Sequence, residues 1–281
     1  MNAPRVFVDG IVFPEGLCWH QGELWFSDFG LRRVFSVDPA GRKTERAYIP
    51  GQPSGIGFRP DGTPLVISML DHLLINLGGD SPTIEADLSS HCVGPANDMI
   101  VDSAGRTYFG AFGYDPGYEG AEALAPSTLS MVSPDGEVTE VADGLLFPNG
   151  MALSEDGGTL VVAETFGNRL TAFTVAEDGT LSSRRVFADL GERAPDGICM
   201  DAAGAIWAGC PFSEDFVHVA EGGEVLASVP VPGRWGVATA LGGEDGRTLY
   251  CAAAKTNLEE FHRGHSVGEI LAVPVETPGQ G

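Results

Sequence analysis

Six residues recur along the chain, each at the centre of a short and similar tripeptide. Four of the tripeptides read Pro-X-Gly, and the other two are Ala96-Asn97-Asp98 and Arg234-Trp235-Gly236. Successive central residues lie 39, 43, 52, 47 and 39 positions apart. The central residues are Glu15, Ser54, Asn97, Asn149, Asp196 and Trp235. If the tripeptides mark structural repeats, these side chains meet at one place.

Carboxylate and amide groups dominate this set, which contains neither His nor Cys. Such oxygen donors favour Ca²⁺, Mg²⁺ or Mn²⁺ over Cu⁺ or structural zinc. Two carboxylates also balance a divalent charge. Without a cation, Glu15 and Asp196 would repel each other, and the pKa of one would rise. The alternative is a turn role, because Asn, Asp and Gly tolerate turn geometry, but that role does not account for Glu15.

The segments after each tripeptide indicate the elements that position it. A short apolar strand, a turn and a second strand follow, as in NGMALSEDGGTLVVA, and then come a third and a fourth strand. Four strands in about 47 residues are typical of one β-propeller blade. We therefore predict an all-β fold, a six-bladed β-propeller of four-stranded antiparallel blades forming a single domain over residues 1–281. The N-terminal strand Arg5–Asp9 would complete the last blade, which closes the ring and protects sheet edges. A β-sandwich does not account for six copies in register.

In a propeller the innermost strands line a central channel. Each recurring residue begins an innermost strand, so all six are expected near one mouth of the channel. Loops after the second strands should lie at the same mouth. Three stand out, namely 69–73 with His72, 112–127 with Phe112, Tyr114 and Tyr118, and 254–267 with His262 and His265. With Trp235, the aromatic residues predict an apolar wall for substrate, and His72 is a candidate catalytic residue at the rim.

Composition narrows the classes of partner and compartment. The 281 residues carry a formal net charge of −23, which argues against nucleic acids and anionic membranes and leaves a small molecule as the expected partner. The N-terminus has no signal-peptide pattern, and no apolar run is long enough to span a bilayer. Five widely spaced cysteines without a C-x-x-C motif indicate reduced thiols and a cytoplasmic location. Oligomeric state is not indicated.

Four motifs in order resemble the senescence-marker-protein/gluconolactonase family, which includes regucalcin and the luciferin-regenerating enzymes. They are FPEGLCW at 13–19, ANDMIVDSAGRTYFG at 96–110, PNGMALSEDG at 148–157 and PDGICMDAAGAIWAG at 195–209. The resemblance covers nearly the whole chain. It implies a six-bladed propeller with one divalent metal in the channel and hydrolysis of lactones.

The resemblance also implies roles for individual residues. Glu15, Asn149 and Asp196 would be direct metal ligands, and Asn97 a further ligand or a residue that orients substrate. Asp196 would serve as general base or nucleophile beside a metal-polarised carbonyl. Ca²⁺ is the expected cation, with Mg²⁺, Mn²⁺ or Zn²⁺ as alternatives. Sugar lactonases of the family tend to carry Arg two residues before the channel Asn, where this chain has Pro95, so an aldonolactone substrate is not expected.

Three other functions remain open from the sequence. They are a phosphotriesterase or aryl-esterase of the same fold, a metal-dependent lyase or isomerase, and a calcium-binding propeller without turnover. Nucleophile-elbow, zinc-helix and phosphate-loop motifs are absent from the sequence.

Overall fold

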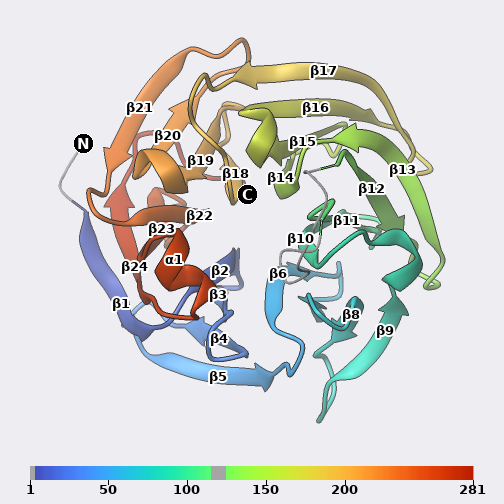
Figure 1. Cartoon of the computed structure of the whole chain (residues 1–281), viewed down its shortest axis with the longest axis horizontal. Helices are drawn as coiled ribbons and strands as arrows, with labels where there is room; N and C mark the ends of the chain where they lie inside the picture. Colours follow the sequence, from blue (N-terminus) through green and yellow to red (C-terminus); the bar gives the residue numbers. More distant parts are fainter. Residues whose placement is uncertain (1–3, 115–124, 281) are drawn as a thin grey trace.

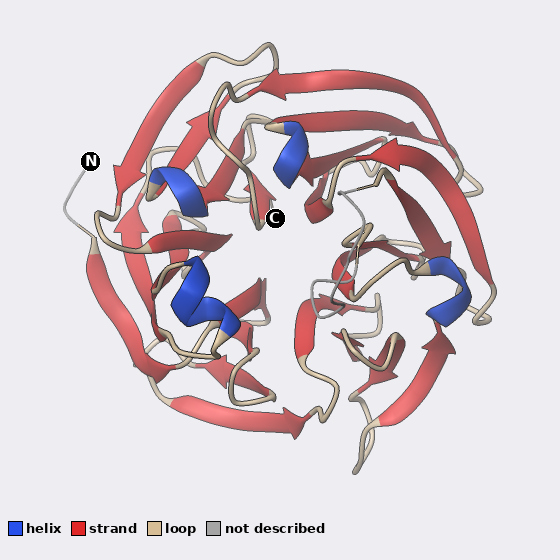
Figure 2. Ribbon diagram, viewed as in Figure 1, coloured by secondary structure: helices blue, strands red, loops and turns tan. Residues whose placement is uncertain are grey.

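A computed structural model describes residues 4–114 and 125–280 of the chain. Six four-stranded antiparallel sheets are arranged in a ring around a central channel (Figure 1). The described helical segments are short and lie between strands (Figure 2). The predicted six-bladed β-propeller is therefore confirmed.

The strands follow one another in each blade from the channel outward. Blade one comprises β2 (Pro14–His20), β3 (Glu23–Asp28), β4 (Arg33–Val37) and β5 (Lys43–Tyr48). Blade two comprises β6 (Pro53–Phe58), β7 (Pro64–Ser68), β8 (Leu73–Asn76) and β9 (Thr83–Asp87). Blade three comprises β10 (Ala96–Val101), β11 (Thr107–Ala111), β12 (Ser127–Val132) and β13 (Val138–Leu145). Blade four comprises β14 (Pro148–Leu153), β15 (Thr159–Glu164), β16 (Arg169–Val175) and β17 (Leu181–Asp189). Blade five comprises β18 (Ile198–Met200), β19 (Ile206–Cys210), β20 (Asp215–Val219) and β21 (Val225–Pro230).

Blade six joins the two ends of the chain. Its sheet runs β22 (Trp235–Gly242), β23 (Thr248–Lys255), β24 (Val267–Pro274) and β1 (Arg5–Ile11). The N-terminal strand thus supplies the outermost strand, with Arg5 opposite Ala272 and Ile11 opposite Gly268. The predicted closure is confirmed, and the strand extends two residues beyond the predicted end because Ile11 is buried in the core.

The core lies between adjacent blades. Trp207 and Phe216 of blade five pack with Leu249 and Cys251 of blade six, and all four are almost fully buried. A middle strand is covered on both faces by neighbouring blades, so its apolar residues run nearly continuously instead of alternating. Burial of these side chains supplies the main driving force for closing the ring.

Neighbouring innermost strands approach each other closely where the tripeptides lie. A Cβ atom at Gly16 would stand 2.3 Å from the carbonyl oxygen of Ser54, and one at Gly150 would stand 2.5 Å from the backbone nitrogen of Ile198. Only glycine permits such an approach of two backbones. The last residue of each Pro-X-Gly is therefore needed for packing between blades, and the central residue is left to face the channel.

One segment expected as a loop contains a helical turn. Within 254–267, α1 spans Leu258–His262, and the side chain of Asn257 accepts a hydrogen bond from the backbone N–H of Glu260 at 3.0 Å. Asn at the N-cap followed by acidic residues in the first turn stabilises a short helix. Among the described residues, no helix is both long and apolar enough to cross a membrane. All five cysteines have free thiols, as the sequence predicts.

Candidate active site in the central channel

A cavity of about 250 Å³ opens at one mouth of the channel, and every blade contributes to its lining. Glu15, Asn97, Asn149 and Asp196 line it together, as do Trp235 and Pro95. Ser54, at the same position of the repeat in blade two, is buried and is not part of the lining, where Gln52 of that blade is found instead.

An irregularity in strand pairing recurs where these residues lie. The register shifts between Glu15 and Cys18 in blade one, between Ala96 and Met99 in blade three, and between Pro148 and Met151 in blade four. A β-bulge bends a strand and changes the direction of a side chain. The bulges therefore turn Glu15, Asn97 and Asn149 toward the channel instead of toward the next blade.

Hydrogen bonds fix the amide side chains. The Nδ2 atom of Asn97 donates to the carbonyl oxygen of Pro148 at 3.2 Å, so the amide oxygen is the atom that remains able to bind a cation. The Nδ2 atom of Asn149 donates to Oγ1 of Thr165 at 3.1 Å, and that hydroxyl donates to the carbonyl oxygen of Pro195 at 2.8 Å. Thr165, which the sequence analysis did not identify, thus connects Asn149 to the residue before Asp196.

Carboxylates are concentrated here without a cationic partner. Burial raises the pKa of Glu15 well above its ordinary value, and the charges of Asp196 and Asp98 raise it further. Burial and the charge of Asp98 likewise raise the pKa of Asp196, against a hydrogen bond from Asn149 that lowers it. Within residues 4–114 and 125–280, no ion pair involves any of these three carboxylates. Oxygen donors with uncompensated negative charge fit a hard divalent cation.

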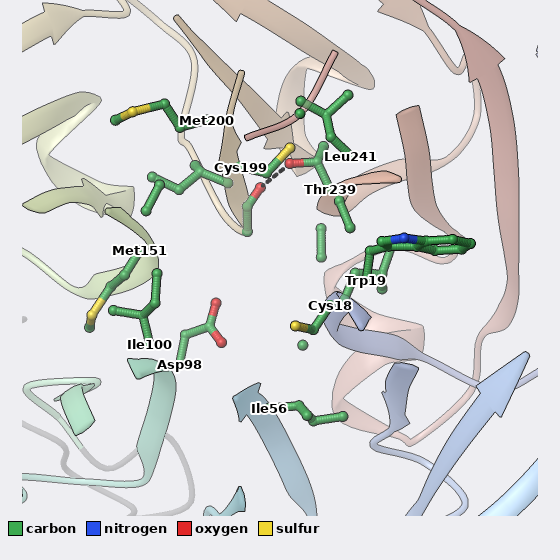
Figure 3. Close-up of a pocket in the computed structure, with 18 of the residues that line it drawn as sticks. Cys18, Trp19, Ile56, Asp98, Ile100, Met151, Cys199, Met200, Thr239 and Leu241 are labelled. Atoms are coloured by element: carbon green, nitrogen blue, oxygen red, sulfur yellow. Dashed lines mark hydrogen bonds between the residues drawn. The ribbon is translucent and has the colours of Figure 1, made fainter. Parts of the chain in front are cut away.

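Asp98 lies beside this site but faces a second cavity in the channel. That cavity measures about 230 Å³ and is lined also by Cys18, Cys199 and Thr239. Figure 3 shows the Asp98 carboxyl group pointing into it, near Ile56 and Ile100. Burial raises the pKa of Asp98 to about 6. Asp98 occupies the place that glycine holds in the Pro-X-Gly copies, and this departure from the repeat is the sequence signal that could have identified it.

The cavity at the candidate site is lined largely by aromatic rings. Phe112, Tyr114 and Trp235 line it, as the sequence analysis expected of substrate-binding residues. Further aromatic residues had not been identified, and they are Phe13, Phe29, Phe147, Phe166, Phe212 and Phe261. Most of them follow the second strand of a blade, which is a second repeated position that could have been found in the sequence.

One sequence-based candidate does not line the cavity, and a second is not among the described residues. His72 is half-buried at the start of β8 and is not among the residues that line the cavity, so its expected place at the rim is wrong. Its backbone has a positive φ of 52° and its carbonyl accepts the N–H of Leu88, which keeps it at the outer side of its turn. Tyr118 lies outside the described residues. Exposed His262 of α1 does line the cavity.

The sequence and the fold of this chain are similar to those of known lactonases and of regucalcin. Residues 13–255 match the family model described as the SMP-30/Gluconolactonase/LRE-like region. The chain is 25% identical to a 6-deoxy-6-sulfogluconolactonase of Pseudomonas putida, over 91% of this chain and 88% of the relative. It is 28% identical to a pentonolactonase of Haloferax volcanii, over 90% and 86% respectively. A crystal structure of regucalcin from Agrobacterium tumefaciens, described as a calcium-binding protein, shares the fold with a TM-score of 0.81 and 23% identity, over 99% of this chain and 95% of that chain.

Proposed function

The chain belongs to the SMP-30/gluconolactonase/LRE-like family, and from this premise we propose that it is a divalent-cation-dependent hydrolase that opens lactone rings. The site of the reaction is the aromatic-lined cavity that contains Glu15 and Asp196. Curated relatives named as lactonases support a lactone as substrate over a phosphotriester or an aryl ester.

One observation carries the metal dependence, namely two carboxylates placed together in the channel without a cationic side chain. Glu15, Asn149 and Asp196 would hold the cation through oxygen atoms, and Asn97 would add a fourth oxygen. The two negative charges match a divalent ion, and burial, which raises the pKa of both carboxyl groups, supports a role for a compensating positive charge. Ca²⁺ is the proposed cation, and Mg²⁺, Mn²⁺ and Zn²⁺ are the alternatives that experiment must separate.

When bound, such a cation polarises a carbonyl group and stabilises negative charge on its oxygen. Asp196 then accepts a proton from the water molecule that attacks the carbonyl carbon. The water oxygen forms the new C–O bond, the ring C–O bond breaks, and the ring oxygen leaves as a hydroxyl group after taking up that proton. Asn97, fixed through its bond to the carbonyl of Pro148, orients the lactone for this attack.

Asp196 could instead attack the carbonyl carbon directly, with water releasing the product in a second step. A single turnover in H₂¹⁸O separates the two routes. Direct attack gives a mixed anhydride of Asp196 and the opened acid, and water attack at its Cγ carbon leaves ¹⁸O in the Asp196 side chain, so label there identifies the direct route; general base catalysis leaves it only in the product acid. Mass spectrometry of the peptide that contains Asp196 makes the distinction.

The central experiment combines metal analysis with turnover. Glu15→Ala, Asn149→Ala and Asp196→Ala should each lose the cation measured by elemental analysis, whereas Ser54→Ala, at the same repeat position but outside the cavity lining, should retain it. Asp196→Asn should keep the fold and lose about 10²- to 10⁴-fold in kcat, the range typical of a general base. Full metal content in all three alanine variants, or full activity of Asp196→Asn, contradicts the proposal. If the protein hydrolyses phosphotriesters but does not hydrolyse lactones, the phosphotriesterase function is favoured.

A further inference from the structure

Two groups of aromatic rings face each other across the candidate active site. We define the first wall by the rings of Phe13, Phe29, Phe212, Trp235 and Phe261, and the second wall by those of Phe112, Tyr114, Phe147 and Phe166. Ring centroids within each wall are close, for example 4.9 Å between Phe13 and Phe261 and 4.4 Å between Phe112 and Phe147. No aromatic contact joins one wall to the other among the described residues.

The propeller explains why the walls are opposed. The first wall comes from blades one, five and six, and the second from blades three and four. In a ring of six, blade one lies opposite blade four and blade six opposite blade three, as Figure 1 shows for β2 and β14. The space between the walls is therefore a slot, and the carboxylates and amides line the same cavity.

The second wall includes an unfavourable backbone conformation. Phe147 has a φ of 60°, in the left-handed region that a bulky residue rarely adopts. Glycine or asparagine would adopt this conformation more readily. A large ring retained there, almost fully buried and in contact with Phe112, Tyr114 and Phe166, indicates that the aromatic surface itself is needed.

Among the described residues, polar groups able to bind a sugar are few in this slot. Apart from the four proposed metal-binding residues, the lining offers Gln52, Tyr114, Thr165 and His262. Oγ1 of Thr165 is already hydrogen-bonded to Asn149 and to the Pro195 carbonyl. No Lys or Arg lines the described part of the cavity, and residues 115–124 contain neither in the sequence. Pro95 also lines the slot and has no side-chain donor.

We propose that the slot selects neutral lactones that carry a flat or bulky apolar substituent and discriminates against polyhydroxylated and anionic lactones. The apolar substituent packs between the two walls while the ester group lies against Glu15, Asn149 and Asp196. An anionic group on the substituent would find no Lys or Arg side chain in the described lining, and several hydroxyl groups would lose hydrogen bonds to water with few replacements. This proposal rests on the proposed function for the lactone, but the shape and polarity of the slot set the substituent.

A series of six-membered lactones tests the proposal with ring size held constant. δ-Octanolactone differs from δ-valerolactone by a propyl group on the ring carbon bonded to the ester oxygen, so each kcat/KM is divided by the rate constant of alkaline hydrolysis of the same lactone. Each fully buried methylene should raise kcat/KM about fourfold. The kcat/KM of δ-octanolactone should therefore exceed that of δ-valerolactone by about 10- to 60-fold. Glucono-δ-lactone, although more reactive in water, should be turned over at least about 100-fold less efficiently than δ-octanolactone. Equal kcat/KM for the two alkyl lactones, or a preference for glucono-δ-lactone, overturns the proposal.

Variants locate the effect in the walls. Trp235→Ala and Phe261→Ala in the first wall, and Phe166→Ala in the second, should reduce the octanolactone-to-valerolactone ratio at least about threefold and leave metal content unchanged. Trp25→Ala is the matched control, because Trp25 is also half-buried but packs against Phe58 outside the cavity. An unchanged ratio in all three folded variants contradicts the assignment.

Binding of lactams separates failure of this proposal from failure of the hydrolase function. Lactams resist hydrolysis, so calorimetry measures binding alone. 3,4-Dihydroquinolin-2-one should bind the metal-loaded protein at least about tenfold more tightly than δ-valerolactam or gluconolactam. If this order is found but no lactone is hydrolysed, the hydrolase function fails and the selectivity stands. If gluconolactam binds as tightly as the aryl lactam, the selectivity fails whatever the activity.

Discussion

Replacing Asp98 by asparagine should stabilise the metal-stripped protein, although it removes a hydrogen-bonded group from the channel. Burial raises the pKa of Asp98 from an ordinary value of 3.8 to about 6. A carboxyl group with this pKa in the folded state costs about 3 kcal/mol of folding free energy once it is ionised. Asparagine is nearly isosteric and can still accept the hydrogen bond that Oδ1 of Asp98 receives from the N–H of Met99.

The sign of the pH dependence follows from the raised pKa. The folded protein holds the proton more tightly than the unfolded chain, so stability falls as pH rises from about 4 to about 7. The cost is absent below about pH 4, where both states are protonated, and is complete above about pH 7. The gain from Asp98→Asn should therefore be about 3 kcal/mol at pH 8 and about half of that at pH 5.

Urea denaturation in the presence of a chelator, followed by tryptophan fluorescence, measures this difference. The free energy of unfolding is compared for the wild type and Asp98→Asn at pH 5 and pH 8. Asp80→Asn serves as control because Asp80 is exposed, and its effect should stay within about 0.5 kcal/mol. Adding back Ca²⁺ should reduce the gain, because the charge of Asp98 contributes to the raised pKa of both Glu15 and Asp196, which the cation would compensate.

Two results would refute the reasoning. If Asp98→Asn is no more stable than the wild type at pH 8 without metal, the carboxylates of the channel are not under electrostatic strain. If the gain is equal at pH 5 and pH 8, the stabilisation has a cause other than ionisation of Asp98. Either result would also remove the electrostatic support for a cation at Glu15 and Asp196.

Two further predictions concern the fold that holds the site. Burial alone would raise the pKa of Glu164, but hydrogen bonds from Arg169 and Thr171 lower it below its ordinary value. Glu164→Gln should therefore lower the free energy of unfolding by about 2 kcal/mol at pH 7, and by less as pH falls below about 4. Urea denaturation with exposed Glu155→Gln as control checks this, and a loss that is independent of pH would contradict it. Gly150→Ala should lower the free energy of unfolding by about 1–3 kcal/mol through overpacking against the backbone of Ile198. Gly157→Ala is the comparison, because Gly157 has open space around it and a φ of 70°, and this variant should lose about 1 kcal/mol. Equal melting temperatures for the two variants would show that the close approach between blades does not require glycine.

The fold was predictable because the repeat expresses a physical requirement in every blade. Glycine at positions such as Gly16 and Gly150 is needed where two innermost strands approach closely, so Pro-X-Gly returns in four of the six blades. The motif resemblance is likewise confirmed by the family match over residues 13–255. The helical turn α1 was not predicted, because a five-residue helix defined by the Asn257 cap shows no hydrophobic periodicity.

The site was only partly predictable. The repeat register placed Glu15 and Asp196 in the channel, but it gave no information on loops, and His72 was therefore assigned wrongly to the cavity rim. The repeat identified only the central residue of each tripeptide as a site residue, so it did not identify Asp98, which replaces glycine at the third position. The sequence predicted an apolar wall from Phe112, Tyr114 and Trp235, but it did not identify aromatic residues such as Phe29 and Phe166, because only ring closure places their blades around one cavity.

The structure separates the groups proposed for chemistry from those proposed for selection. Glu15 and Asn149 belong to the bulged segments that begin their innermost strands, and Asp196 lies just before β18, where its N–H donates to the carbonyl oxygen of Gly209. Most wall residues, among them Phe29 and Phe166, follow the second strands, where a loop can change without altering the packing of the ring. Substitutions in the walls should therefore change the preferred substituent while metal content stays constant. Substitutions at the bulges should abolish activity on every lactone alike.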